Sequence, residues 1–160
     1  QIAALFSKLK LYHPIFKSCN AGSKTDSWCC NCPKCLFTFT ILSPFISMPE
    51  LVSIYGENLF EKESLLKDLD ELTGLSPVKP FECVGTTEEV NLALWKTIQQ
   101  HDPNQPLPFL LEYFKTSSKY KSIQAKDFNA FIHKYDNQHF LTEPAFNTLK
   151  EEILCIFSKK

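Results

Sequence analysis

The sequence predicts a mainly α-helical fold that carries a four-cysteine zinc knuckle. Apolar residues recur at helical spacing along most of the chain, and glycines, prolines and a capping box mark the ends of these segments. Five of the seven cysteines lie between residues 19 and 35, which is typical of a metal-binding turn. No apolar run approaches the ~20 residues that a membrane-spanning helix needs. We therefore expect a helical domain with no membrane partner.

Two helical regions are expected, one at 1–75 with the knuckle and one at 76–160 after a proline-bounded segment. The chain is long enough for both to share one core, so we expect one compact domain. It starts with Gln1 and its only methionine is Met48, which indicates a piece of a longer polypeptide. Because clustered thiols suit a reducing compartment, we expect a cytoplasmic protein.

The first region should contain four helices. Residues 2–12 combine apolar residues with lysines and end before a proline. Residues 33–45 start with a proline, which suits the first helical position, and are apolar nearly all round. This pattern predicts a central, buried helix. Residues 49–56 and 61–74 each end in a glycine that suits a helix C-terminus.

The second region should contain four more helices. Thr86 and Glu89 form a capping-box pattern, which predicts a helix from there to about residue 101. Others are expected at 108–120, 125–135 and 142–157. In the last two, apolar stripes at helical spacing should be core, and Cys155 should pack beside the last stripe. The stripes consist of Phe128, Phe131, Ile132 and Tyr135, and of Phe146, Leu149, Ile153 and Phe157.

The cysteine block has the spacing of a zinc site. Cys29, Cys32 and Cys35 supply three thiolates on one short turn, and Cys19 can return as a fourth ligand across a loop. Four sulfur ligands complete the tetrahedral coordination of a structural zinc ion. Such an ion stabilises a fold and has no open position for catalysis. An iron–sulfur cluster and free or disulfide-bonded thiols are the alternatives. Cys30 is left over, because adjacent residues rarely both bind one ion in a closed knuckle.

The composition argues against several function classes. All 17 basic residues are lysines, they are dispersed, and the net charge is −1. Nucleic-acid-binding surfaces usually show a basic patch with arginines, so no nucleic-acid partner is expected. The chain contains no glycine-rich phosphate loop, no Ser-His-Asp pattern and no HExxH motif. We therefore expect this chain alone to be inactive and not to bind ATP.

One segment, SPVKPFECVG at residues 76–85, fits neither a helix nor a turn. It has two prolines and brings Lys79, Glu82 and Cys83 together within five residues. In an extended strand the side chains of Lys79 and Cys83 would point to one side and that of Glu82 to the other. A linker between two helical halves is the simplest interpretation.

Four motifs in order resemble the C-terminal part of MurL-type UDP-N-acetylmuramoyl-L-alanyl-L-glutamate epimerases. They are SCN…WCCNCPKC, LFTFTILSPF, GENLFE and KPFECVGTTEE, and the resemblance runs from residue 13 to about residue 95. The cysteine block is also similar to the zinc site of 7-cyano-7-deazaguanine synthases, which supports the four-cysteine ligand set. Cys30 stands where those enzymes usually carry glycine, which leaves the second ligand open between Cys29 and Cys30.

The resemblance implies a parent enzyme with an α/β PP-loop-like architecture that uses ATP and Mg²⁺. Such an enzyme inverts the terminal L-glutamate of UDP-MurNAc-L-Ala-L-Glu after activating its α-carboxylate as an acyl-adenylate. Its ATP-binding portion would precede this chain. Two other functions remain open, namely another PP-loop-class enzyme that acts on a base or a tRNA, and a zinc-stabilised helical binding module.

With this chemistry, the segment at 76–85 becomes a candidate part of the active-site cleft. A thiol can transfer the α-proton once nearby positive charge lowers its pKa, so Cys83 is the first candidate and Glu82 the second. Lys79 would supply the positive charge or hold a phosphate. The competing interpretation is a buried Cys83 that packs under the helix starting near Thr86.

Overall fold

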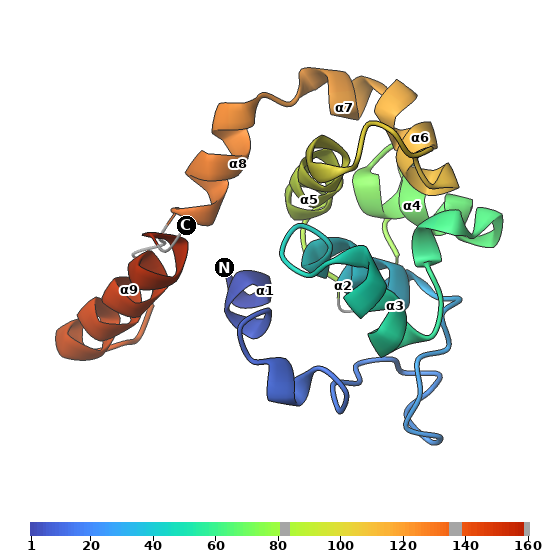
Figure 1. The fold of residues 1–160 in the computed structure, drawn as a ribbon. Coiled ribbons are helices and arrows are strands. Elements are labelled where there is room, and N and C mark those ends of the chain that lie inside the picture. Colours follow the sequence, from blue (N-terminus) through green and yellow to red (C-terminus); the bar gives the residue numbers. More distant parts are fainter. Residues whose placement is uncertain (81–83, 135–138, 159–160) are drawn as a thin grey trace.

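The computed structural model describes residues 1–80, 84–134 and 139–158, and within these ranges the chain forms helices and no β-strand. The prediction of a mainly helical fold is therefore confirmed for the described residues (Figure 1). None of these helices is both long and apolar enough to cross a membrane. The α-helices are α1 (Ile2–Phe6), α2 (Pro33–Leu42), α3 (Met48–Tyr55), α4 (Leu66–Thr73), α5 (Thr87–Gln100), α6 (Phe109–Thr116), α7 (Ser118–Ser122), α8 (Ala125–Ile132) and α9 (Glu143–Ser158), with short 3₁₀ turns η1 (Lys10–Tyr12), η2 (Leu59–Glu61) and η3 (Glu63–Leu65).

Helix α2 lies at the centre of the fold and packs against α1, α4 and α5. Pro33 occupies its first turn, where a missing N–H costs no hydrogen bond. Leu36 and Phe39 are completely buried, and burying each such side chain contributes about 1.5–3 kcal/mol relative to leaving it exposed. The prediction of a central, buried helix is confirmed.

Glycines end the next two α-helices as the sequence predicts. Gly56 follows α3 with φ 93° and Gly74 follows α4 with φ 72°, both in the left-handed region that glycine adopts without strain. The turns let α3 and α4 return to α2, and they bury Leu51, Leu69 and Leu72 in the shared core.

Helix α5 begins at the predicted capping box. Thr86 N–H donates to Glu89 Oε2 (2.7 Å), and Glu89 N–H donates to Thr86 Oγ1 (3.2 Å). The buried face of α5 includes Val90 and Leu94 and closes over α2 and α4. Core packing therefore joins the two sequence regions on either side of residue 76.

Residues 2–12 do not form one helix, contrary to expectation. Helix α1 ends at Phe6, where the Ser7 hydroxyl donates to the Ala4 carbonyl oxygen (2.8 Å). His13 then turns back, and its Nε2 reaches the Phe6 carbonyl oxygen (3.0 Å) while its Nδ1 reaches Glu50 Oε1 (2.9 Å). The helix is broken because this buried histidine bonds back to the end of α1 and across to Glu50 of α3.

The C-terminal helices lead away from the core. The continuous helix expected at 108–120 is divided at Ser117, whose hydroxyl accepts from Tyr120 N–H (3.2 Å) and starts α7. Helices α8 and α9 then extend to one side of the body (Figure 1). Leu149 is 44% exposed and Cys155 is exposed. The prediction that the last stripe and Cys155 are core is therefore wrong for these two residues, although Phe128 and Ile153 are buried.

Candidate metal centre

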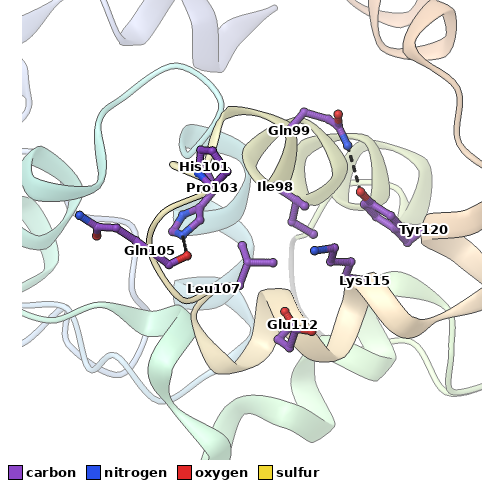
Figure 2. Close-up of a pocket in the computed structure, with 9 residues that line it drawn as sticks. All are labelled: Ile98, Gln99, His101, Pro103, Gln105, Leu107, Glu112, Lys115 and Tyr120. Carbon is purple, nitrogen blue, oxygen red and sulfur yellow. Dashed lines mark hydrogen bonds between the residues drawn. The ribbon is translucent and has the colours of Figure 1, made fainter.

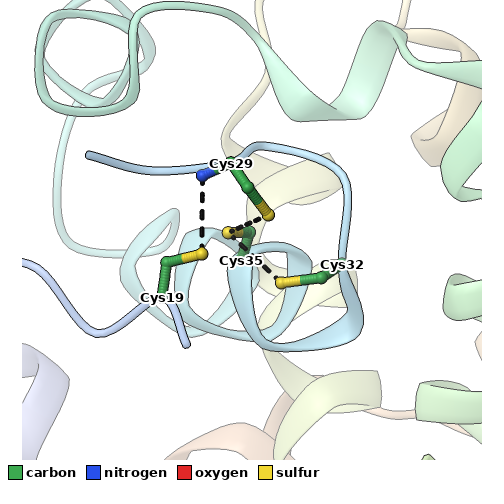
Figure 3. A group of neighbouring side chains, drawn as sticks. All are labelled: Cys19, Cys29, Cys32 and Cys35. Carbon is green, nitrogen blue, oxygen red and sulfur yellow. Dashed lines mark hydrogen bonds between the residues drawn. The ribbon is translucent and has the colours of Figure 1, made fainter. Parts of the chain in front are cut away.

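Four cysteines converge beside the N-terminus of α2. The sulfur atoms of Cys19, Cys29, Cys32 and Cys35 all lie within 4.8 Å of one another (Figure 3). Cys35 Sγ is 3.7 Å from Cys29 Sγ and 3.5 Å from Cys32 Sγ. A zinc tetrahedron with bonds of ~2.3 Å has edges of about 3.8 Å, whereas a disulfide bond would need about 2.05 Å. These two distances are close to such an edge, and both are far longer than a disulfide bond.

The loop between Cys19 and Cys29 is folded tightly around the first sulfur. Gly22 N–H and Cys29 N–H donate to Cys19 Sγ at 3.2 and 3.4 Å. The Gly22 carbonyl oxygen accepts from the N–H groups of Thr25 and Ser27, both at 3.1 Å. A Cβ at Gly22 would overlap the Ser27 carbonyl oxygen. Only glycine therefore fits here, and the loop brings Cys19 to the other three cysteines.

Cys30 has a structural position that differs from its neighbours. Its backbone φ is 52°, in the left-handed region where glycine is favoured. Its side chain is buried and its Sγ donates to the Tyr55 carbonyl oxygen (3.2 Å). The reversal of the backbone turns Cys29 toward the sulfur group and Cys30 toward α3. The geometry therefore favours Cys29 as the second sulfur of the cluster.

The pKa values of Cys19, Cys32 and Cys35 are shifted in different directions. Burial raises the pKa of Cys19, but hydrogen bonds to its sulfur, first those from the N–H groups of Cys29 and Gly22 and then those from the Cys29 and Cys35 side chains, outweigh this and lower the pKa to about 7. Burial raises the pKa of Cys32 to about 11, and burial also raises the pKa of Cys35. Four adjacent thiolates would repel each other, so a divalent cation is needed to hold them deprotonated together. A donor set of four sulfur atoms gathered within 4.8 Å fits zinc.

A column of aromatic rings connects the cysteine loop to the core. Trp28, which precedes Cys29, stacks on Tyr55 with ring centroids 4.4 Å apart. Tyr55 in turn meets Phe39 of α2 edge-on at 5.0 Å, and its hydroxyl donates to Thr38 Oγ1 (2.9 Å). The position of the loop is thus fixed by packing as well as by the cysteines.

The second predicted site is described only at its edges. Lys79 is exposed, and Pro80 beside it is buried. Glu82 and Cys83 lie outside the described residues. On the far side, Gly85 lies so close to α2 and α5 that an added Cβ would be 2.9 Å from the Phe37 ring and would overlap Glu89. Both flanks of the segment therefore rest on the body of the fold.

Comparison with known protein families gives a match to most of this chain. A family model described as the MurL C-terminal domain matches residues 15–127. The chain belongs to this family. The matched range contains the whole cysteine cluster and the segment at 76–85, whereas α1, η1 and α9 lie outside it.

Three curated proteins, each named UDP-N-acetyl-alpha-D-muramoyl-L-alanyl-L-glutamate epimerase, are similar to this MurL C-terminal domain. The Micromonospora protein is 40% identical over 97 residues, covering 58% of this chain and 22% of the relative. The Salinispora tropica protein is 39% identical over 97 residues, with shares of 58% and 21%. The Xanthomonas oryzae pv. oryzae protein is 36% identical over 99 residues, with shares of 58% and 22%. The chain spans about a fifth of the length of these relatives, and no solved structure matches it significantly.

The MurL C-terminal domain also has a surface pocket that sequence reasoning missed. It has a volume of about 520 Å³ and lies between the end of α5, the loop at 101–108 and helices α6 and α7 (Figure 2). His101 Nε2 donates to the carbonyl oxygens of Gln105 and Pro106 (3.2 and 3.1 Å) and so fixes the loop. Gln99 donates to the Tyr120 hydroxyl oxygen (2.9 Å), which leaves the Tyr120 O–H free to donate.

None of the predicted site residues lines this pocket, whose remaining polar groups are Glu112 and Lys115. The only signal in the sequence is the group of prolines at 103, 106 and 108, which indicates a stiff connection between two helices. That signal predicts a loop and says nothing about a hollow beside it.

Proposed function

We propose that this chain is the C-terminal domain of an ATP-dependent epimerase that inverts the terminal L-glutamate of UDP-MurNAc-L-Ala-L-Glu in peptidoglycan precursor synthesis. The observation that carries this proposal is the family membership, together with 36–40% identity to proteins named as that epimerase. Those names favour the epimerase over an enzyme acting on a base or a tRNA. The proposal includes an N-terminal portion with a PP-loop-like ATP site and a cytoplasmic location.

The proposed cofactor of this domain is one structural zinc ion. Cys19, Cys29, Cys32 and Cys35 would hold it, and all four coordination positions would be filled by sulfur. The ion would stabilise the loop that presents Trp28 to Tyr55, and would take no part in the reaction. The alternative of a purely structural binding module shares this zinc site, so zinc content alone does not separate the two functions.

The proposed chemistry explains why an epimerase would consume ATP. An ionised α-carboxylate makes removal of the α-proton very unfavourable, because the carbanion would carry a second negative charge. When the carboxylate attacks the α-phosphorus of ATP, pyrophosphate leaves and a mixed anhydride with AMP forms, in which the acyl group no longer carries the carboxylate charge. The α-proton can then pass to a base while an enolate-like intermediate forms, and an acid returns a proton to the other face. Hydrolysis of the anhydride releases AMP and the precursor, which now ends in D-glutamate.

Cys83 is the proposed proton-transfer residue, with Glu82 as its alternative, and Lys79 is proposed to hold a phosphate or to supply positive charge. Support comes from the flanks, because Pro80 is buried and Gly85 packs on Phe37 while Lys79 remains exposed. A segment held at both ends can present its side chains in a fixed direction.

The experiment uses the full-length protein that contains this chain. Incubation with UDP-MurNAc-L-Ala-L-Glu, ATP and Mg²⁺ should yield D-glutamate and AMP, and the 160-residue chain alone should yield neither. Cys83→Ser should lose solvent deuterium exchange at the α-carbon while AMP release continues, and loss in Glu82→Gln instead would assign the proton transfer to Glu82. If both variants exchange and epimerise at the wild-type rate, the segment has no catalytic role. If the wild-type protein forms no D-glutamate, the epimerase proposal itself is rejected.

A further inference from the structure

The N-terminal part of the chain exposes five large apolar side chains. They are Ile2, Leu9, Leu11, Tyr12 and Ile15, which are 84%, 51%, 89%, 55% and 69% exposed. Three of them, Leu9, Tyr12 and Ile15, line a groove of about 510 Å³ together with Phe6 and Phe16. Soluble proteins rarely leave several large apolar side chains together in water, and such patches mark interaction sites. We call these five residues the N-terminal apolar face.

The face is held firmly by the core. Phe6 and Phe16, which form the floor of the groove, pack together at 4.8 Å between ring centroids, and Phe16 meets Trp28 edge-on at 5.3 Å. The buried His13 bridges the Phe6 carbonyl oxygen and Glu50 at 3.0 and 2.9 Å. A surface that is already ordered loses little conformational entropy when a partner binds. These contacts are therefore those of a preformed docking site.

We propose that the N-terminal apolar face docks against the remaining portion of the epimerase polypeptide; this inference rests on the proposed function. The curated relatives are about five times as long as the matched part, so a large neighbouring portion exists in them. The family match begins at residue 15, and four of the five face residues precede it. The face therefore lies at the N-terminal boundary of the family domain.

The chemistry of the face specifies the partner surface. Its groove accepts a protruding apolar side chain, and the exposed Lys8 and Lys10 at its edge suit acidic residues around that side chain. A lipid surface fits less well, because α1 has only five residues and membrane-surface binding usually uses a longer amphipathic helix. A second copy of this chain would need the same face to be complementary to itself.

The cysteine cluster supports this docking site indirectly. Trp28 precedes Cys29, and its ring lies 5.3 Å from that of Phe16 in the floor of the groove. Loss of the sulfur cluster would release the Trp28 loop and with it the contact that supports Phe16 in the floor of the groove. We therefore expect docking to require an intact cluster, which gives the knuckle a role in assembling the enzyme.

The test compares hydroxyl-radical labelling of the 160-residue chain with labelling of the full-length protein that contains it. Leu11, Tyr12 and Ile15 should be labelled at least fivefold less in the full-length protein. Exposed Leu149 of α9 serves as the internal control and should react equally in both. A double variant, Leu11→Asp with Ile15→Asp, should restore labelling of Tyr12 in the full-length protein, whereas Leu149→Asp should not. Circular dichroism verifies that each variant is folded.

Several outcomes would overturn the proposal. Equal labelling of the face in both proteins would do so. Protection of the isolated chain that disappears on dilution would identify a second copy as the occupant instead, and protection only with vesicles containing anionic phospholipid would identify a membrane. Protection without D-glutamate formation would reject the proposed function but keep the docking site. D-glutamate formation without protection would do the reverse.

Discussion

The cysteine loop and the C-terminal arm, which consists of α8 and α9, show opposite relations between regular structure and burial. The loop at 19–32 has no regular helix, yet Cys19, Trp28 and Cys30 are buried in the main core. Helix α9 has sixteen residues of regular structure, yet Leu149 is 44% exposed. Local backbone hydrogen bonds are enough to form a helix, whereas burial needs partners elsewhere in the chain. Regular structure is therefore a poor guide to which part of this molecule is most firmly held.

The largest expected effect comes from breaking the cysteine cluster. We expect one zinc per chain, and its removal by a strong chelator or by Cys35→Ser should unfold the N-terminal half. Structural zinc binding is worth about 10–16 kcal/mol in small knuckles, which is comparable to the whole stability of a domain. Elemental analysis measures the zinc, and Trp28 fluorescence with circular dichroism measures unfolding.

The matched control is Cys155→Ser, because Cys155 is an exposed cysteine outside the cluster. It should leave both zinc content and the unfolding midpoint unchanged. Elemental analysis that finds no metal, or finds iron, would contradict the zinc site. If Cys35→Ser and Cys155→Ser lowered the unfolding midpoint equally, the cysteine loop would contribute no more to stability than the C-terminal arm.

A second comparison truncates one apolar side chain in each region. Phe39 is completely buried in α2 and contacts Tyr55 and Phe60 edge-on, each at 5.0 Å. Phe39→Ala should lower the free energy of unfolding by about 3–5 kcal/mol. Leu149→Ala in α9 should change it by no more than about 0.5 kcal/mol. Chemical denaturation measures both, and a similar loss in the two variants would show that α9 is packed in solution.

A third change tests the tight fold of the loop itself. In Gly22→Ala the new methyl group overlaps the Ser27 carbonyl oxygen, so the loop must open. We expect a loss of about 1–3 kcal/mol, as for other overpacked sites, and weaker zinc retention in a competition assay with a chelator. Lys24→Ala, at an exposed position of the same loop, is the control. Unchanged zinc retention in Gly22→Ala would show that the loop does not hold Cys19 in place.

The smallest expected effects concern two helix starts that have similar caps. Thr86 caps α5 in the body, and Asp127 Oδ2 accepts from Gln124 N–H (2.7 Å) at the start of α8. Thr86→Ala should lower the global free energy of unfolding by about 1 kcal/mol. Asp127→Ala should reduce amide protection mainly at the start of α8, because the first turn of a helix can open without global unfolding. Hydrogen exchange separates the two, and a global effect of Asp127→Ala would contradict this difference.

Features set by neighbouring residues could be predicted from the sequence. Pro33 and the run after it predict α2, Gly56 and Gly74 end their helices with positive φ, and Thr86 starts α5 through its capping box. The four grouped cysteines also converge as their spacing suggests. All of these depend on contacts within a few residues, or on a loop short enough to close easily.

Features set by distant contacts could not be predicted. The break after Phe6 depends on His13 and Glu50, which are far apart in sequence, and no local pattern shows that contact. The stripe with Leu149 has helical periodicity, but periodicity gives the existence of an apolar face and not its partner. The pocket beside His101 depends on how α6 folds back on α5.

The short span of the cysteine cluster has a consequence for how the protein acquires its shape. All four sulfur atoms come from residues 19–35, so the loop that must close is short and its entropic cost is small. Contacts so local in sequence form early in folding. The cluster can therefore assemble while a ribosome is still synthesising α5, before most of the core exists. Trp28 can then stack on Tyr55 as soon as α3 emerges, and the later helices can pack against this pair.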